Sequence, residues 1–166
     1  MGSEIYILVV EDEPDVLDAI VRDLADFEEI FPIEMAETAE VARKQVSSIY
    51  DDNNRIGLMV CDHILPGENG VEFLVDMHER EETFSSRKML ITGQAGHDDT
   101  IKALNKGGLR HYISKPWQPS ELQEAARDLL TDYVIEHERN LLPYMSLLDS
   151  EKLSESIRLR GGVSDG

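Results

Sequence analysis

Short runs of apolar residues recur along the chain and alternate with segments in which apolar positions return every three or four residues. The runs are rich in β-branched residues and hardly alternate with polar ones, which is typical of strands covered on both faces of a parallel sheet. They lie at 5–10, 30–35, 56–61, 88–92 and 111–114. The periodic segments predict helices at 14–24, 39–49, 71–81, 98–106 and 119–137. Strands that alternate with helices in this way predict a doubly wound α/β fold with a five-stranded parallel sheet and right-handed crossovers.

The segment that follows the predicted sheet has a different character. The α/β pattern accounts for residues 4–130, and beyond it apolar residues recur in steps of three and four, close to the spacing of a coiled-coil seam. Pro143 interrupts this spacing, which predicts a break near Asn140. We therefore expect a helical extension or linker over 131–160, which either pairs with a second copy of the chain or folds back on its own domain. Residues 161–166 are expected to be disordered.

Charge and cysteine content narrow the classes of partner. The 166 residues carry a net charge of -18, which argues against binding to a nucleic-acid backbone or to an anionic membrane surface. The sole cysteine, Cys61, cannot form an internal disulfide, and no apolar run approaches the length that spans a bilayer. The sequence therefore predicts a cytoplasmic protein with neither nucleic acid nor membrane as its partner.

Acids and a lysine lie at the ends of predicted strands. Glu11 and Asp12 follow the first strand, Asp62 follows the third, and Lys115 follows the last. Because the carboxyl ends of parallel strands meet in one crevice, we expect these side chains to lie close together. Clustered carboxylates repel one another and favour a hard, oxygen-seeking cation such as Mg2+. One of the carboxylates could attack phosphorus and form an acyl phosphate, so the site predicts phosphoryl chemistry.

Further landmarks make the pattern specific. They are Pro66, Gly70, Thr92, Tyr112 and Pro116. Together with the acids and the lysine, and in this order and spacing, they resemble the receiver domain of two-component response regulators. The resemblance implies a flavodoxin-like sheet with strand order 2-1-3-4-5, a receiver domain over residues 4–130, and an extension that is either an appendage or a linker to a missing output domain.

The resemblance also implies a role for each site residue. Asp62 would accept a phosphoryl group from a sensor histidine kinase or phosphotransfer protein, with Lys115 and Thr92 contacting that group. Thr92 and Tyr112 would form the switch that changes the interactions of a partner or an output domain. The implied Mg2+ ligands are Glu11, Asp12, Asp62 and the backbone carbonyl of Ile64. Such a protein is a signalling switch that catalyses only its own phosphorylation and dephosphorylation, and a homodimer would form through the C-terminal helix or the fourth-helix face.

Two other classes of protein share parts of this pattern. A phosphatase of the haloacid dehalogenase type also uses an aspartate nucleophile, Mg2+ and a lysine, but it needs a second acid at the position of Ile64. A flavodoxin-like electron carrier would need a phosphate-binding loop where Glu11, Asp12 and Glu13 would repel the phosphate. The histidines, among them His63, show no metal-ligand spacing and are interpreted as structural or surface residues. Whether the peptide bond between Lys115 and Pro116 is cis is left open by the sequence.

Overall fold

A parallel sheet forms the centre of the computed structural model, which describes residues 3–93, 102 and 105–164. Its order is β2-β1-β3-β6-β7, which confirms the predicted order 2-1-3-4-5. The strands are β1 (Ile5–Val10), β2 (Ile33–Ala36), β3 (Arg55–Asp62), β6 (Arg87–Thr92) and β7 (Leu109–Ser114). Every neighbouring pair runs parallel, so the carboxyl ends of all these strands lie at one edge of the sheet.

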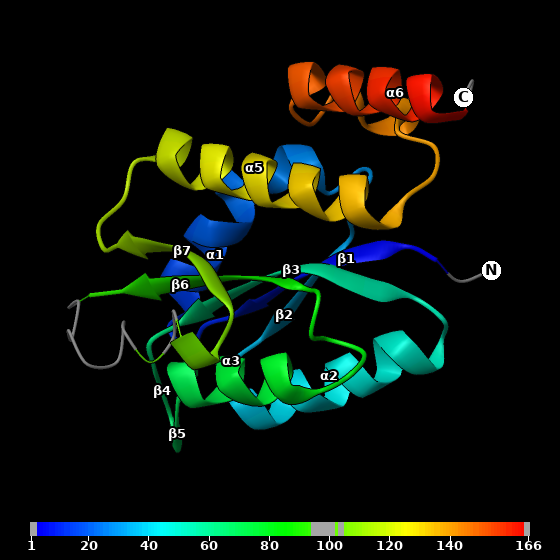
Figure 1. Cartoon of the computed structure of the whole chain (residues 1–166). Helices are drawn as coiled ribbons and strands as arrows, with labels where there is room; N and C mark the ends of the chain where they lie inside the picture. Colours follow the sequence, from blue (N-terminus) through cyan, green and yellow to red (C-terminus); the bar gives the residue numbers. More distant parts are fainter. Residues whose placement is uncertain (1–2, 94–101, 103–104, 165–166) are drawn as a thin grey trace.

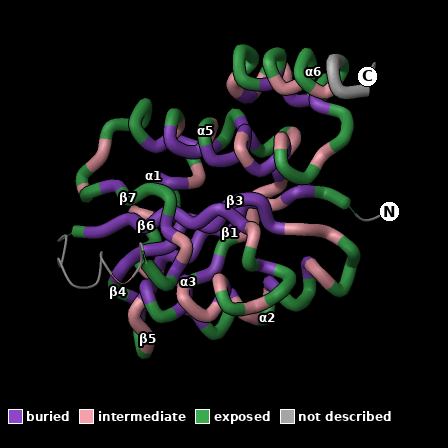
Figure 2. The backbone as a smooth tube through the Cα atoms, in the orientation of Figure 1, coloured by how far each residue is buried: buried purple, intermediate pink, exposed green. Residues whose placement is uncertain are grey.

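Helices cover both faces of the sheet, as the doubly wound pattern predicts. They are α1 (Pro14–Asp23), α2 (Ala39–Asp51), α3 (Gly70–Glu79) and α5 (Pro119–His137). In Figure 1, α1 and α5 lie on one face of the sheet, and α2 and α3 lie on the other. Each face has its own apolar core, and the tube in Figure 2 is buried along most of the sheet. Most of the helix predicted at 98–106 lies outside the described residues.

Local sequence signals explain where several helices begin. Pro14 occupies the first turn of α1, where its missing N–H is not needed. The Thr38 side chain accepts a hydrogen bond from the Val41 amide at 3.1 Å and caps α2. The Asn69 side chain accepts a hydrogen bond from the Val71 amide at 2.7 Å and caps α3. This helix follows β3, the strand that ends at the predicted phosphoacceptor Asp62.

Most strands differ from the predicted bounds by one to three residues at an end, and β2 differs most. β2 begins at Ile33 rather than at Ile30, because Phe31 is wholly buried against the ring of Tyr144 instead of joining the sheet. Between β3 and α3 the chain also forms a small antiparallel hairpin of β4 (Ile64–Leu65) and β5 (Glu68–Asn69).

The C-terminal tail packs on its own domain. After α5 ends at His137, the chain forms the 3-10 helix η2 (Leu142–Tyr144) and then α6 (Ser150–Ser164). The predicted break is confirmed, since Pro143 lies within η2. The apolar tail residues Leu141, Tyr144, Leu148 and Leu153 are buried in the same core as α1 and α5. In Figure 1, α6 lies over α5 on the side away from the sheet.

Polar contacts fix the tail in this position. The Tyr144 hydroxyl donates to Glu138 at 3.0 Å, and Arg160 on α6 donates to the backbone carbonyl of Glu138 at 2.9 Å. Arg127 on α5 lies 3.3 Å from the Leu147 carbonyl, to which it donates. The apolar spacing of the tail therefore reflects docking on the chain's own domain, which is one of the two alternatives that the sequence left open.

Two expectations for the tail need correction. Residues 161–164 are helical, as the last turn of α6, whereas the sequence predicted disorder from 161 onward. The apolar face that motivated a homodimer through the C-terminal helix is largely occupied within the chain itself. A homodimer through the fourth-helix face concerns residues that lie mostly outside the described part of the chain, and it stays a prediction. None of the described helices is long and apolar enough to cross a membrane.

Candidate functional site

The carboxyl ends of β1, β3 and β7 bring the predicted acids and lysine together. Glu11, Asp12 and Asp62 each present a carboxylate oxygen, and these oxygens all lie within 4.8 Å of one another. The Lys115 ammonium lies 2.8 Å from Asp62 Oδ1 and 3.1 Å from Glu11 Oε1. Residues separated by more than a hundred positions along the chain thus form one cluster, at the edge where parallel sheets bind their ligands.

Because the ionisable groups of this cluster are largely buried and lie close together, neighbouring charges shift the pKa of Glu11 and of Lys115. Glu11 is wholly buried, and one of its oxygens accepts a hydrogen bond from the Glu13 amide at 3.1 Å. Burial raises the pKa of Glu11, and the nearby charge of Asp62 adds to this, although the Glu13 amide and Lys115 act in the opposite direction. For Lys115, burial alone would lower the pKa, but hydrogen bonding and attraction to Asp62 and Glu11 outweigh it and the pKa is raised. The lysine therefore stays cationic beside the acids.

Asp62 lies where β3 ends and close to the start of α3. It is the last residue of the strand and only 5 % exposed. A side chain at position 70 would collide with the Asp62 carbonyl, because a Cβ built on Gly70 falls 1.8 Å from that oxygen. The Gly70 amide instead donates to the His63 carbonyl at 2.8 Å. Gly70 is thus required for α3 to begin directly beside Asp62.

Thr92 ends β6 and faces the same edge. It is 1 % exposed, and its carbonyl accepts a hydrogen bond from the Lys115 amide at 2.8 Å, which ties β6 to β7 at the site. Its hydroxyl oxygen lies 3.1 Å from Nδ1 of His63. The sequence-based interpretation of His63 as a structural or surface residue therefore missed a contact with a predicted site residue. The only signal in the sequence is its position directly after Asp62.

The remaining predicted residues lie around this cluster. Tyr112, in β7, is 45 % exposed, and Ile64, in the hairpin, carries an exposed apolar side chain. The peptide bond between Lys115 and Pro116 is cis, which the sequence left open. Trp117 donates its indole N–H to Asp23 at 2.8 Å.

The chemistry of the cluster follows from its donors. Three carboxylates supply only oxygen ligands, which suits a hard divalent cation better than a thiophilic one. The ammonium of Lys115 lies against the same carboxylates, where it can offset negative charge on an incoming anion. The site can therefore bind a cation and an anionic group side by side.

Comparison with known proteins identifies the family. Residues 7–127 match the response regulator receiver domain, and the chain belongs to that family. It is a receiver domain of a response regulator in two-component signalling. The match begins within β1, spans the other strands of the sheet and includes all the predicted site residues.

Curated relatives and solved structures agree with this assignment. The hydrogenase transcriptional regulatory protein HoxA of Bradyrhizobium diazoefficiens is 28% identical over 164 residues, which are 99% of this chain and 32% of that protein. The aerobic respiration control protein ArcA of Escherichia coli is 35% identical over 126 residues, which are 76% of this chain and 48% of that protein. The chain thus spans 32% to 48% of the length of these relatives.

Solved structures of receiver domains superpose on the fold. The signal receiver domain of an HD domain-containing protein from Pseudomonas fluorescens has a TM-score of 0.71 at 26% identity, covering 84% of this chain and 96% of that one. A CheY-like receiver domain protein from Methanospirillum hungatei has a TM-score of 0.68 at 27% identity, covering 81% and 99%.

Proposed function

We propose that Asp62 is the phosphoacceptor of this receiver domain, with a histidine kinase or phosphotransfer protein as its donor. The observation that carries the proposal is the ion pair of 2.8 Å between Asp62 and Lys115, inside a group of three carboxylates. In the reaction, a carboxylate oxygen of Asp62 forms a bond to phosphorus while the bond from phosphorus to the donor's imidazole nitrogen breaks. The product is an acyl phosphate on Asp62.

Magnesium fits the donor set as the proposed cofactor. We assign Glu11, Asp12 and Asp62 as the side chains that hold it, and the backbone carbonyl of Ile64 as a further ligand. The carboxylate oxygens of the three acids lie close enough to serve one ion, and Mg2+ favours such oxygen ligands. When bound, the ion supplies positive charge that offsets the charge of the transferring phosphoryl oxygens.

Lys115 and Thr92 are proposed to contact the phosphoryl group. Lys115 would exchange part of its ion pair with Asp62 for a phosphoryl oxygen, which keeps its charge compensated. The Thr92 hydroxyl would move to donate a hydrogen bond to another phosphoryl oxygen. Tyr112, on the adjacent strand, would change its position in response to this movement of Thr92. The result is a change in population between two states of the surface that a partner or output domain reads. The protein would then act as a switch and catalyse only its own phosphorylation and dephosphorylation.

Phosphotransfer from acetyl phosphate tests the proposal. Incubation of the full chain with acetyl phosphate and Mg2+ should add one phosphoryl mass, detectable by intact-mass spectrometry. The Asp62→Asn variant should remain unlabelled, while the control Asp76→Asn, at a half-buried residue of α3 paired with Arg43, should label like the wild type. Normal labelling of Asp62→Asn would show that another residue accepts the phosphoryl group.

A further inference from the structure

A histidine ring lies against the hydroxyl that the phosphoryl group would need. His63 Nδ1 is 3.1 Å from Thr92 Oγ1, and both residues are almost fully buried. We propose that His63 is a positioning residue that holds the Thr92 hydroxyl in the resting state and competes with the phosphoryl group for it. This inference rests on the proposed phosphorylation of Asp62.

The backbone fixes the ring at this place. The His63 amide donates to the Ile91 carbonyl at 2.9 Å, and the His63 carbonyl accepts from the Gly70 amide at 2.8 Å. His63 is thereby anchored to β6 on one side and to the start of α3 on the other. Because His63 is only 6 % exposed, its contact with Thr92 is set by the fold rather than by a freely moving side chain.

A threonine hydroxyl has a single proton to donate. In the proposed resting state this proton is donated to Nδ1 of His63, which acts as the acceptor. A phosphoryl oxygen is charged and is the stronger acceptor, so phosphorylation of Asp62 would draw the proton away from the ring. The hydrogen bond between His63 and Thr92 would therefore oppose the switch and set how readily Thr92 moves.

Binding of beryllofluoride, a phosphoryl mimic, measures this competition. In the presence of Mg2+, fluorine NMR of the full chain gives its affinity. His63→Phe keeps a ring but removes the acceptor nitrogen, and it should bind the mimic about 3- to 10-fold more tightly, the value of one hydrogen bond. His63→Asn offers an acceptor oxygen near the place of Nδ1 and should return the affinity toward that of the wild type. In a Thr92→Val background, His63→Phe should have a clearly smaller effect, because the hydroxyl is gone.

The outcomes separate this inference from the proposed function. Failure of the wild-type chain to bind the mimic, or equal binding by Asp62→Asn, would refute the proposed function itself. Asp62-dependent binding that His63→Phe leaves unchanged or weakens would refute the role of His63 alone, as would an equal effect of His63→Phe in the Thr92→Val background. Nitrogen NMR of the wild-type imidazole needs no variant: an unprotonated Nδ1 supports the proposal, and a protonated Nδ1 in the resting state overturns it.

Discussion

Two lysines at opposite ends of the same sheet have opposite electrostatic surroundings. Lys115, at the carboxyl end of β7, is paired with Asp62 and Glu11, and its pKa is raised because these acids outweigh its burial. Lys88, at the amino end of β6, is wholly buried and donates to the carbonyls of Thr83 at 2.7 Å and Phe84 at 2.9 Å.

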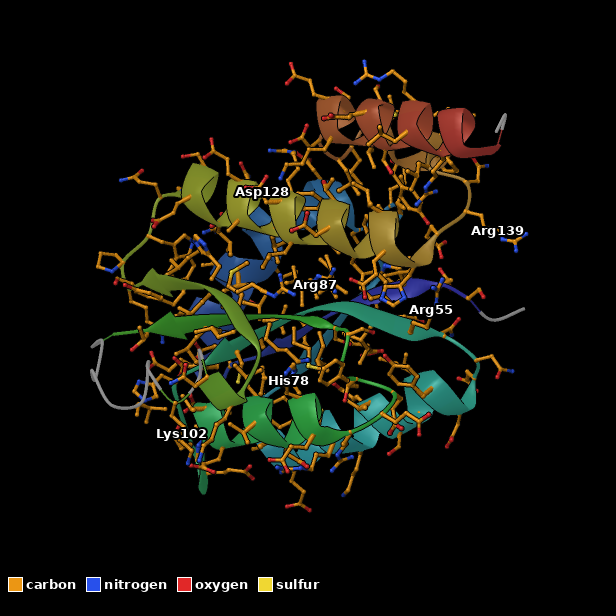
Figure 3. All side chains as sticks on the ribbon, in the orientation of Figure 1. Arg55, His78, Arg87, Lys102, Asp128 and Arg139 are labelled. Carbon is orange, nitrogen blue, oxygen red and sulfur yellow. The ribbon has the colours of Figure 1, made fainter. Side chains whose placement is uncertain are left out.

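The surroundings of Lys88 destabilise its charge. Burial, together with the charges of Arg87 and Arg110, lowers the pKa of Lys88 to about 7. Its ammonium also lies 3.2 Å from Nδ1 of His78. In Figure 3, Arg87 lies between the sheet and α5, and His78 lies on the other face, near α3. Burial alone therefore does not determine the charge state of a lysine, because the charge of its partners also contributes. A lysine paired with carboxylates stays charged and is available to an anion. A lysine whose partners are backbone carbonyls holds the loop that carries those carbonyls in place.

Replacement of Lys115 should have the largest effect on stability. Lys115→Met leaves two buried carboxylates without their cation, and we expect the free energy of unfolding to fall by about 3 kcal/mol at pH 8. The loss should be smaller at pH 5, because the raised pKa of Glu11 allows that acid to take up a proton. Added Mg2+ should recover part of the loss, since the ion would offset the same charges. Urea unfolding with and without Mg2+ measures both effects.

Lys88→Met is the matched control for the magnesium effect. It removes a lysine of the same sheet far from the acids, so Mg2+ should stabilise this variant no more than the wild type. The exposed Lys44→Met should leave stability unchanged under every condition. If Mg2+ stabilised the Lys115 and Lys88 variants equally, the electrostatic contrast between the two ends of the sheet would be wrong.

The sequence predicts one end of the sheet far better than the other. The acids and Lys115 directly follow apolar strand runs, and the rule that parallel strands share a ligand edge brings them together. Lys88 begins such a run as well, but its partners come from the loop after α3, whose path no periodicity specifies. The sequence also does not predict the contact of His63 with Thr92, because that contact depends on the register between β3 and β6. In the tail, the spacing of Leu141, Tyr144 and Leu148 shows that one face is apolar but does not show what covers that face.

The pH dependence of stability should reveal Lys88. In the unfolded chain its pKa is near 10.4, whereas in the folded chain it is about 7, so between these values the unfolded chain binds more protons. The contribution of Lys88 to stability therefore rises with pH across this window. Lys88→Met lacks the rise, and its stability relative to the wild type should fall by about 2 kcal/mol from pH 7 to pH 9. Unfolding at pH 7, 8 and 9 measures the difference, and parallel curves for the two proteins would disprove it.

Magnesium affinity should distinguish the two acids that follow β1. Asp12 is partly exposed while Glu11 is buried and already paired with Lys115, so we expect Asp12 to be the more direct ligand. Asp12→Ala should weaken Mg2+ binding about tenfold, or 1.4 kcal/mol, and Glu11→Gln should weaken it less. Isothermal titration of Mg2+ into each variant checks the order, with Asp76→Asn as the control. Undiminished affinity in Asp12→Ala would remove that residue from the site.

The smallest effect is expected from Arg110, an exposed residue whose charge lowers the pKa of Lys88. Arg110→Gln removes that repulsion, so the pKa of Lys88 should move upward and the pH-dependent rise in stability should begin at a higher pH. At pH 7 the gain should be only about 0.3 kcal/mol, because an exposed charge is well screened by water. High salt should weaken the influence of Arg110 in the wild type and so reduce the difference between the two proteins. Arg139→Gln, which removes an exposed charge on the tail instead, should leave the profile unchanged. A shift of the Arg110→Gln profile toward lower pH would mean that the arginine stabilises the buried ammonium, and the electrostatic contrast between the two ends of the sheet would then be wrong.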